Sequence, residues 1–164
     1  MELREFKDVF DRFYRPVKNF LYYKLGDVSL AEDIVQEVFL KAWEKRDSIR
    51  LETVKSLLYT IATNLANNHY NSARARFEFE LKENLDHTTQ ENPQYLLENT
   101  EFKTRLEKAL AALPEKQRTV FLMSRMDELT YTEIAERLEI SVKAVEKRMH
   151  EALGFLRNVL DQKL

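Results

Sequence analysis

The sequence predicts an all-α protein with two small helical domains. Only two glycines and three prolines occur in 164 residues, while the helix-favouring residues Leu, Glu, Lys and Ala are abundant. Apolar residues recur with the 3.6-residue period of an amphipathic helix along most of the chain. This periodicity weakens over residues 77–98, where carboxylates outnumber lysines and residues 87–93 are polar and turn-forming. We therefore expect one domain at residues 1–76, a flexible acidic linker at 77–98, and a second domain at 99–164.

The first domain is expected to form a three-helix bundle. Pro16 should bend or interrupt the first helix. A turn at residues 26–28 precedes the second helix, which Ser29 and Glu32 should start as a capping box. After a break near residues 47–51, the third helix begins at about Val54. The apolar stripes expected to be buried are Leu3, Phe6, Phe10, Phe13, Val17 and Phe20, then Ile34, Val35, Val38, Phe39, Ala42 and Trp43, and finally Val54, Leu58, Ile61, Ala62 and Leu65.

One face of the second helix lies away from its apolar stripe and combines charges with an exposed leucine. A solvated surface explains the charges, whereas a partner-binding face also explains the leucine. The residues of this face are Asp33, Gln36, Glu37, Leu40 and Lys41.

The third helix carries a polar face that is mostly asparagine. Asparagine is a mediocre helix former, but its amide donates and accepts at once, which suits it to base edges. Neighbouring tyrosines can stack on unpaired bases, and arginines after the helix can meet phosphates. The alternative is a solvated face that is rich in asparagine. The face comprises Thr60, Asn64, Asn67, Asn68 and Asn71; the tyrosines are Tyr59 and Tyr70, and the arginines Arg74 and Arg76.

The second domain is expected to hold four helices, the last two forming a helix-turn-helix. The first begins near Asn99, and Pro114 starts the next in its tolerated first turn. Thr130 and Glu133 form a capping box for the third helix, and Ser141 caps the fourth. The residues expected to be buried in these helices are Phe102, Leu106, Leu110, Leu113, Val120, Phe121, Met123, Ile134, Ala135, Leu138, Val142, Val145, Met149, Ala152, Leu153 and Leu156.

The outer face of the fourth helix is polar and mostly cationic, which suits insertion into the major groove of duplex DNA. Lys143, Glu146, Lys147 and His150 lie on it, flanked by Arg148 and Glu151. A purely structural helical hairpin is the alternative. The turn position most often held by glycine is Glu139, where a left-handed backbone would cost on the order of 1 kcal/mol. We therefore expect a slightly different turn there.

Composition excludes several classes of protein and site. There is no cysteine, so disulfides and thiolate chemistry are excluded, and the three histidines lack metal-ligand spacing. No apolar run approaches the length of a membrane span and no signal peptide is apparent, so a cytoplasmic protein is expected. Neither a glycine-rich phosphate loop nor a nucleophile triad is present. We expect no enzyme activity, cofactor or metal. The formal net charge of −2 does not itself suggest DNA binding.

Four segments of the chain resemble a known family. Residues 31–43 are similar to the A-E-D-x-x-Q-E-x-F-x-x-x-W segment of sigma-70-type sigma factors, particularly the short extracytoplasmic-function (ECF) subgroup with only regions 2 and 4. Residues 59–64 resemble the family's L-Y-x-I-A-x-N segment, and residues 113–118 its L-P-x-x-x-R. Residues 130–153 resemble its helix-turn-helix. The resemblance covers nearly the whole chain, in order.

The resemblance implies a factor that binds bacterial RNA polymerase core and directs promoter recognition and transcription initiation. Region 2 would dock on the β′ clamp coiled coil through Asp33, Gln36, Glu37 and Leu40. It would read and melt the minus-ten element through Asn64, Asn67, Asn68, Asn71, Arg74 and Arg76. Region 4 would touch the β flap and read the minus-thirty-five element through Lys143, Lys147, Arg148, His150 and Glu151. An anti-sigma factor is a possible further partner.

The chain departs from the family pattern at a few positions. Leu57 replaces the usual tryptophan, and Glu146 and Glu151 stand where many members have basic residues, so phosphate affinity should be lower. Two alternatives remain open: a dimeric helix-turn-helix regulator of the kind that ends response regulators, and a pure interaction module. A further hypothesis is that the acidic linker holds the two domains together in an inactive form.

Overall fold

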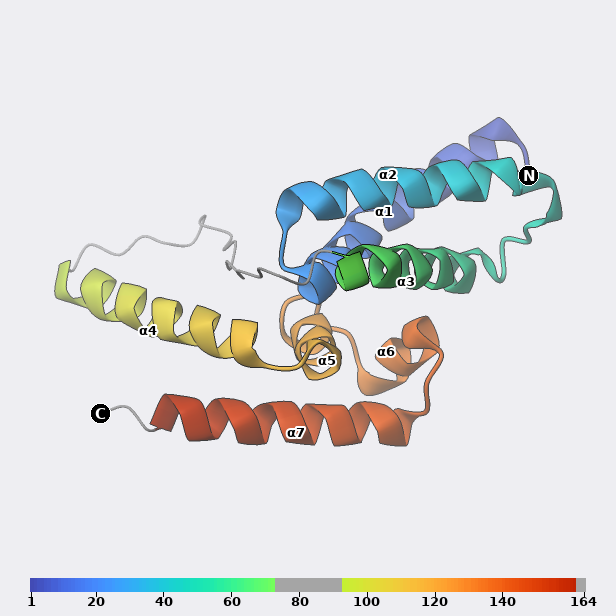
Figure 1. Cartoon of the computed structure of the whole chain (residues 1–164). Coiled ribbons are helices and arrows are strands. Elements are labelled where there is room, and N and C mark those ends of the chain that lie inside the picture. Colours follow the sequence, from blue (N-terminus) through green and yellow to red (C-terminus); the bar gives the residue numbers. More distant parts are fainter. Residues whose placement is uncertain (73–92, 162–164) are drawn as a thin grey trace.

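The computed structural model describes residues 1–72 and 93–161. Over these two ranges the chain forms seven α-helices and one short 3-10 helix, without a strand (Figure 1). The all-α prediction is therefore confirmed. The helices are α1 (Leu3–Leu25), α2 (Val28–Glu44), α3 (Val54–Ser72), α4 (Pro93–Ala112), α5 (Glu115–Arg125), α6 (Tyr131–Leu138) and α7 (Val142–Asp161), and the 3-10 helix η1 (Arg46–Ser48) follows α2.

In the amino-terminal half, α1, α2 and α3 pack against one another. Helix α1 continues through Pro16 and is not interrupted there. It ends at Gly26, whose left-handed backbone (φ 76°) is readily adopted by glycine. The side chain of Asp27 then caps α2 by accepting a bond from the backbone N–H of Leu30 at 3.0 Å. The predicted Ser29 capping box is wrong, because Asp27 caps the helix instead and the helix begins two residues earlier, at Val28.

Most of the residues expected in the amino-terminal core are buried, but two of the first helix are not. Leu3 is 70% exposed and Phe10 is 38% exposed. Leu3 lies in the first turn of α1. The ring of Phe10 still packs on that of Phe39, with centroids 5.0 Å apart. Phe13, Trp43 and Leu65 are half-buried. The predicted stripe therefore covers the core only where α1 faces its neighbours.

In the carboxy-terminal half, α4, α5 and α6 pack around the long helix α7. Helix α4 begins at Pro93 and not near Asn99 as expected, since proline is tolerated in a first helical turn. Pro114 is the N-cap residue of α5, so that helix starts one residue later than predicted. Phe102 is 45% exposed and Val142 is 38% exposed, contrary to expectation. Both lie on helix surfaces that their neighbours leave open.

The two halves also pack directly on each other. Helix α5 lies against α1 and α6 lies against α3 (Figure 1). Arg118, only 2% exposed, donates to the backbone carbonyls of Tyr23 (2.7 Å) and Lys24 (2.8 Å) at the end of α1. Its other bonds run to the carbonyls of Leu113 and Leu110 beside α5. A single buried arginine thus satisfies carbonyls at the ends of two helices from different halves.

Candidate nucleic-acid interface

The α6–α7 pair has the geometry of a helix-turn-helix with both caps formed. The backbone N–H of Thr130 donates to the Glu133 carboxylate at 2.8 Å, and the Glu133 N–H donates to the Thr130 hydroxyl at 3.1 Å. The backbone N–H of Thr130, and also its hydroxyl at 3.2 Å, donate to the Glu133 carboxylate and lower the pKa of Glu133 below its usual value. Ser141 caps α7 by accepting from the N–H of Ala144 at 3.0 Å. Both predicted caps are confirmed.

The turn between these helices is the left-handed one, contrary to the expectation of a different turn. Glu139 has φ 57° and ψ 46°, and the N–H of Ile140 donates to the Ala135 carbonyl at 3.1 Å. This is the hydrogen-bond pattern that usually has glycine at the left-handed position. A glutamate therefore bears the backbone strain that glycine would avoid.

Helix α7 separates a packed side from an open one. Val145, Met149, Ala152 and Leu156 are buried, whereas the polar side chains on the opposite side face outward. Lys143, Glu146, Lys147, His150 and Glu151 are exposed, and Arg148 is half-buried. The structure thus brings the predicted duplex-reading residues together on one accessible surface.

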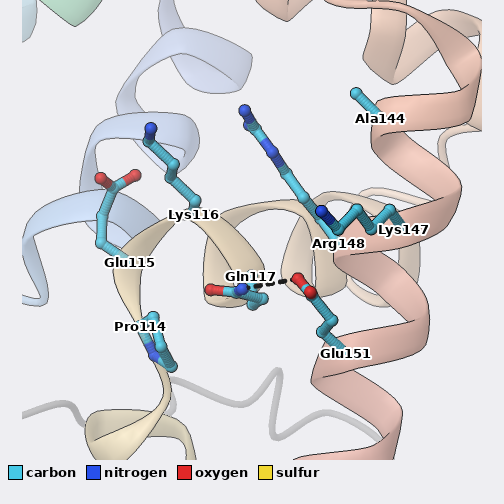
Figure 2. A pocket seen from close by; sticks show the side chains of 8 residues that line it. All are labelled: Pro114, Glu115, Lys116, Gln117, Ala144, Lys147, Arg148 and Glu151. Atoms are coloured by element: carbon cyan, nitrogen blue, oxygen red, sulfur yellow. Dashed lines mark hydrogen bonds between the residues drawn. The ribbon is translucent and has the colours of Figure 1, made fainter.

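A groove of about 430 Å³ lies between the start of α5 and the first half of α7 (Figure 2). Lys116 and Arg148 extend in the same direction from the two helices that flank it. Glu151 accepts a bond from Gln117 at 2.8 Å, and Glu115 pairs with Lys24 at 2.8 Å. Both carboxylates of the groove are therefore engaged, while its cations remain available to an anion such as a DNA phosphate. Lys116 was not predicted as a site residue, although its place in the first turn after Pro114 was a usable signal.

The asparagine-rich face of α3 is exposed as far as the structure describes it. Thr60, Asn64, Asn67 and Asn68 all lie on the surface. The side chain of Asn71, that of Tyr70, and residues Arg74 and Arg76 lie outside the described residues.

Tyr59 does not belong to this face, so its predicted stacking on bases is wrong. It is 2% exposed and packs edge-on against Phe20, with ring centroids 5.2 Å apart. Burial raises the pKa of Tyr59 to about 12, an effect that the nearby Arg137 partly opposes. The residue is one position away from Thr60, and a helix turns about 100° per residue, which directs its ring into the core.

The outward face of α2 is separate from both of these surfaces. Asp33, Gln36, Leu40 and Lys41 are exposed and Glu37 is half-buried. Leu40 is 62% exposed, so this face carries one large apolar side chain among polar ones.

The described residues contain neither a candidate metal site nor a candidate membrane-spanning helix. Within residues 1–72 and 93–161, no group of three or more His, Asp or Glu side chains is arranged to hold a metal ion. Among the helices of the same ranges, none combines the length and the apolar character that crossing a membrane requires.

Comparison with known proteins identifies both halves. Residues 9–76 match the family described as Sigma-70 region 2, and residues 103–156 match Sigma-70, region 4. The alternative of a helix-turn-helix regulator of the response-regulator kind does not explain the amino-terminal half of the chain. The match to Sigma-70 region 2 does.

Curated relatives match over nearly the full length. The chain is 31% identical to the ECF RNA polymerase sigma factor SigW of Bacillus subtilis (strain 168), over 94% of this chain and 88% of that protein. It is 30% identical to the RNA polymerase sigma factor YlaC of the same organism, over 89% of this chain and 86% of the relative.

Solved structures share the fold. CnrH, in complex with the cytosolic domain of CnrY, aligns with a TM-score of 0.65 at 22% identity, covering 99% of this chain and 92% of that one. RpoE, in complex with the anti-sigma factor NepR from Bartonella quintana, aligns with a TM-score of 0.63 at 19% identity, covering 99% and 100%. Taken with the two domain matches and the curated relatives, the chain belongs to the sigma-70 family of RNA polymerase sigma factors, in its ECF subgroup.

Proposed function

We propose that this sigma factor, which directs promoter recognition, does so through three separate faces on α2, α3 and α7. The observation that carries the proposal is that three helices of one chain expose three polar surfaces while their opposite sides form the core. Each face has a different chemistry, so each suits a different part of a transcription complex. The domain boundaries at residues 76 and 99 remain part of this proposal.

The α7 face suits duplex DNA and would read the minus-thirty-five element. Lys143, Lys147, Arg148 and His150 supply donors for base edges and phosphates. Glu151 is held by Gln117, so it would act as an oriented acceptor. Glu146 and Glu151 reduce the net positive charge of the α7 face. We therefore infer that core polymerase contributes much of the affinity for DNA.

The α3 face suits single-stranded DNA and would read the minus-ten element as it opens. The exposed amides of Asn64, Asn67 and Asn68 can pair with the edges of unstacked bases. Asn71, Arg74 and Arg76 would extend this surface toward the phosphates.

The α2 face would dock on the β′ clamp coiled coil of core polymerase. Its exposed Leu40 lies among Asp33, Gln36 and Glu37, giving an apolar centre with a polar rim, as protein interfaces commonly have. Region 4 would also touch the β flap. An anti-sigma factor is a further proposed partner, supported by the solved structure of RpoE with the anti-sigma factor NepR.

Run-off transcription with purified core polymerase and pooled genomic fragments tests the proposal. The wild-type chain should give discrete promoter-directed transcripts, and Asn64→Ala should reduce promoter opening while core binding stays within about twofold. Specific duplex binding without any binding to core would refute the function. A parallel loss of core affinity in Asn64→Ala would refute the division of roles between α2 and α3.

A further inference from the structure

Helix α6 and the turn after it place two carboxylates, Glu136 and Glu139, against one end of the α3 face. The hydroxyl of Ser56 donates to the Glu139 carboxylate at 2.6 Å, and the hydroxyl of Thr60 reaches the same oxygen at 3.5 Å. Beside them, the ammonium group of Lys55 pairs with Glu136 at 3.3 Å. These three bonds join region 2 to region 4 through side chains alone.

The donors in this contact continue the proposed DNA face. Ser56, Thr60 and Asn64 are spaced four residues apart, so they form one stripe along α3. A step of four residues advances about 6 Å along a helix, which puts the Glu139 contact next to Asn64. Lysine ammonium and serine or threonine hydroxyl groups are also among the usual donors to nucleic-acid phosphates.

The backbone of Glu139 is one that glycine would suit better. This residue is in the left-handed conformation, which glycine adopts without strain. Glycine has no side chain and could not reach α3. The glutamate thus retains a strained turn while supplying the carboxylate that Ser56 and Thr60 bind.

We propose that Glu139 and Glu136 act as phosphate mimics that occupy the amino-terminal end of the minus-ten face in the free chain. Lys55, Ser56 and Thr60 are then phosphate-binding residues of region 2, and α6 is an internal competitor for the promoter strand. The proposal rests on the proposed role of α3 in reading the minus-ten strand.

Promoter geometry explains how the contact is released. The names of the two promoter elements place them about 25 base pairs apart, or roughly 85 Å at ~3.4 Å per pair. Helices α3 and α6 are in contact in this structure, so one chain cannot engage both elements without separating them. Binding to core polymerase and promoter would therefore free the donors of α3.

The test is binding of a random-sequence, 12-nucleotide single strand to the free full-length chain, measured by fluorescence anisotropy. Glu139→Gly removes the carboxylate and suits the left-handed turn, and Glu136→Gln removes the second charge. Each should tighten binding by about three- to tenfold, because the DNA strand no longer has to displace a carboxylate from the α3 donors. Glu44→Gln, an exposed glutamate at the end of α2, is the matched control and should stay within twofold.

Two further measurements separate uncovering from a general change in charge. Ser56→Ala, added to Glu139→Gly, should reverse at least half of the gain, since the freed hydroxyl is then absent. In assembled holoenzyme on promoter DNA, Glu139→Gly should match wild type within twofold. Equal binding by wild type and Glu139→Gly, or an equal gain in Glu44→Gln, would overturn the proposal. The strand assay uses neither polymerase nor promoter, so its failure is distinct from failure of run-off transcription.

Discussion

Arg118 offers the sharpest test of how the two halves are joined. Its guanidinium makes three bonds of 2.7–3.0 Å and one of 3.5 Å to backbone carbonyls. A hydrogen bond to a charged group contributes about 1.5–3 kcal/mol net, so the three short bonds represent roughly 4.5–9 kcal/mol. Arg118→Met keeps the aliphatic stem, and the carbonyls at the helix ends can regain water. Leaving a buried carbonyl without its donor costs about 1–3 kcal/mol, and water offsets part of this cost, so for the three short bonds we expect a net loss of about 3–5 kcal/mol.

Urea unfolding, followed by far-ultraviolet circular dichroism and by fluorescence of Trp43, measures this loss. Trp43 is the only tryptophan and lies in region 2. The two signals should coincide for wild type and separate in Arg118→Met. In thermal unfolding, the melting temperature of the variant should be roughly 10 °C lower. Arg125→Met in the same helix is the control. That arginine is exposed and lies 5.6 Å from the ring centroid of Phe121, so its loss should cost at most about 1 kcal/mol. A loss below about 1 kcal/mol in Arg118→Met, or an equal loss in the control, would refute the reasoning.

Three other predictions concern the core, the turn and the DNA face. Because burial raises the pKa of Tyr59 to about 12, its contribution to stability is full below pH 10 and is lost as the pH rises toward 12. Tyr59→Phe should therefore flatten the fall in the free energy of unfolding between about pH 10 and pH 12, and an unchanged slope in urea titrations would contradict this. Ser141→Ala removes the cap of α7 and should cost about 1 kcal/mol, measured by the same titrations; no loss would mean that the bond to Ala144 contributes nothing. In holoenzyme, Lys147→Ala should weaken promoter duplex binding at every sequence and lower the salt slope by about 1, whereas a sequence-specific effect would assign Lys147 to base reading.

The sequence predicted local structure well where neighbouring residues determine it. The Thr130 and Ser141 caps formed as expected, because each depends on residues within three positions. The predicted start of α2 is wrong because Asp27 and Ser29 are both residues that commonly cap helices. The tight turn at Gly26 decides between them in favour of Asp27. The inward position of Tyr59 could not be separated from the neighbouring polar face by residue type alone, since tyrosine suits either environment.

Residue pattern and family motifs alone determined that this is a helical, two-part sigma factor, and they located its three polar faces. The helices and their polar faces follow from periodicity and short-range spacing, and the family follows from the resemblance of the motifs; a single sequence displays both. Only the tertiary structure decided that Arg118 joins α5 to α1 and that Glu139 reaches Ser56, 83 positions away. Such contacts depend on how two independently patterned halves dock. The local periodicity of one half contains no information about its partner in the other half. The proposed role of Glu139 could therefore be recognised only once the structure placed α3 beside it.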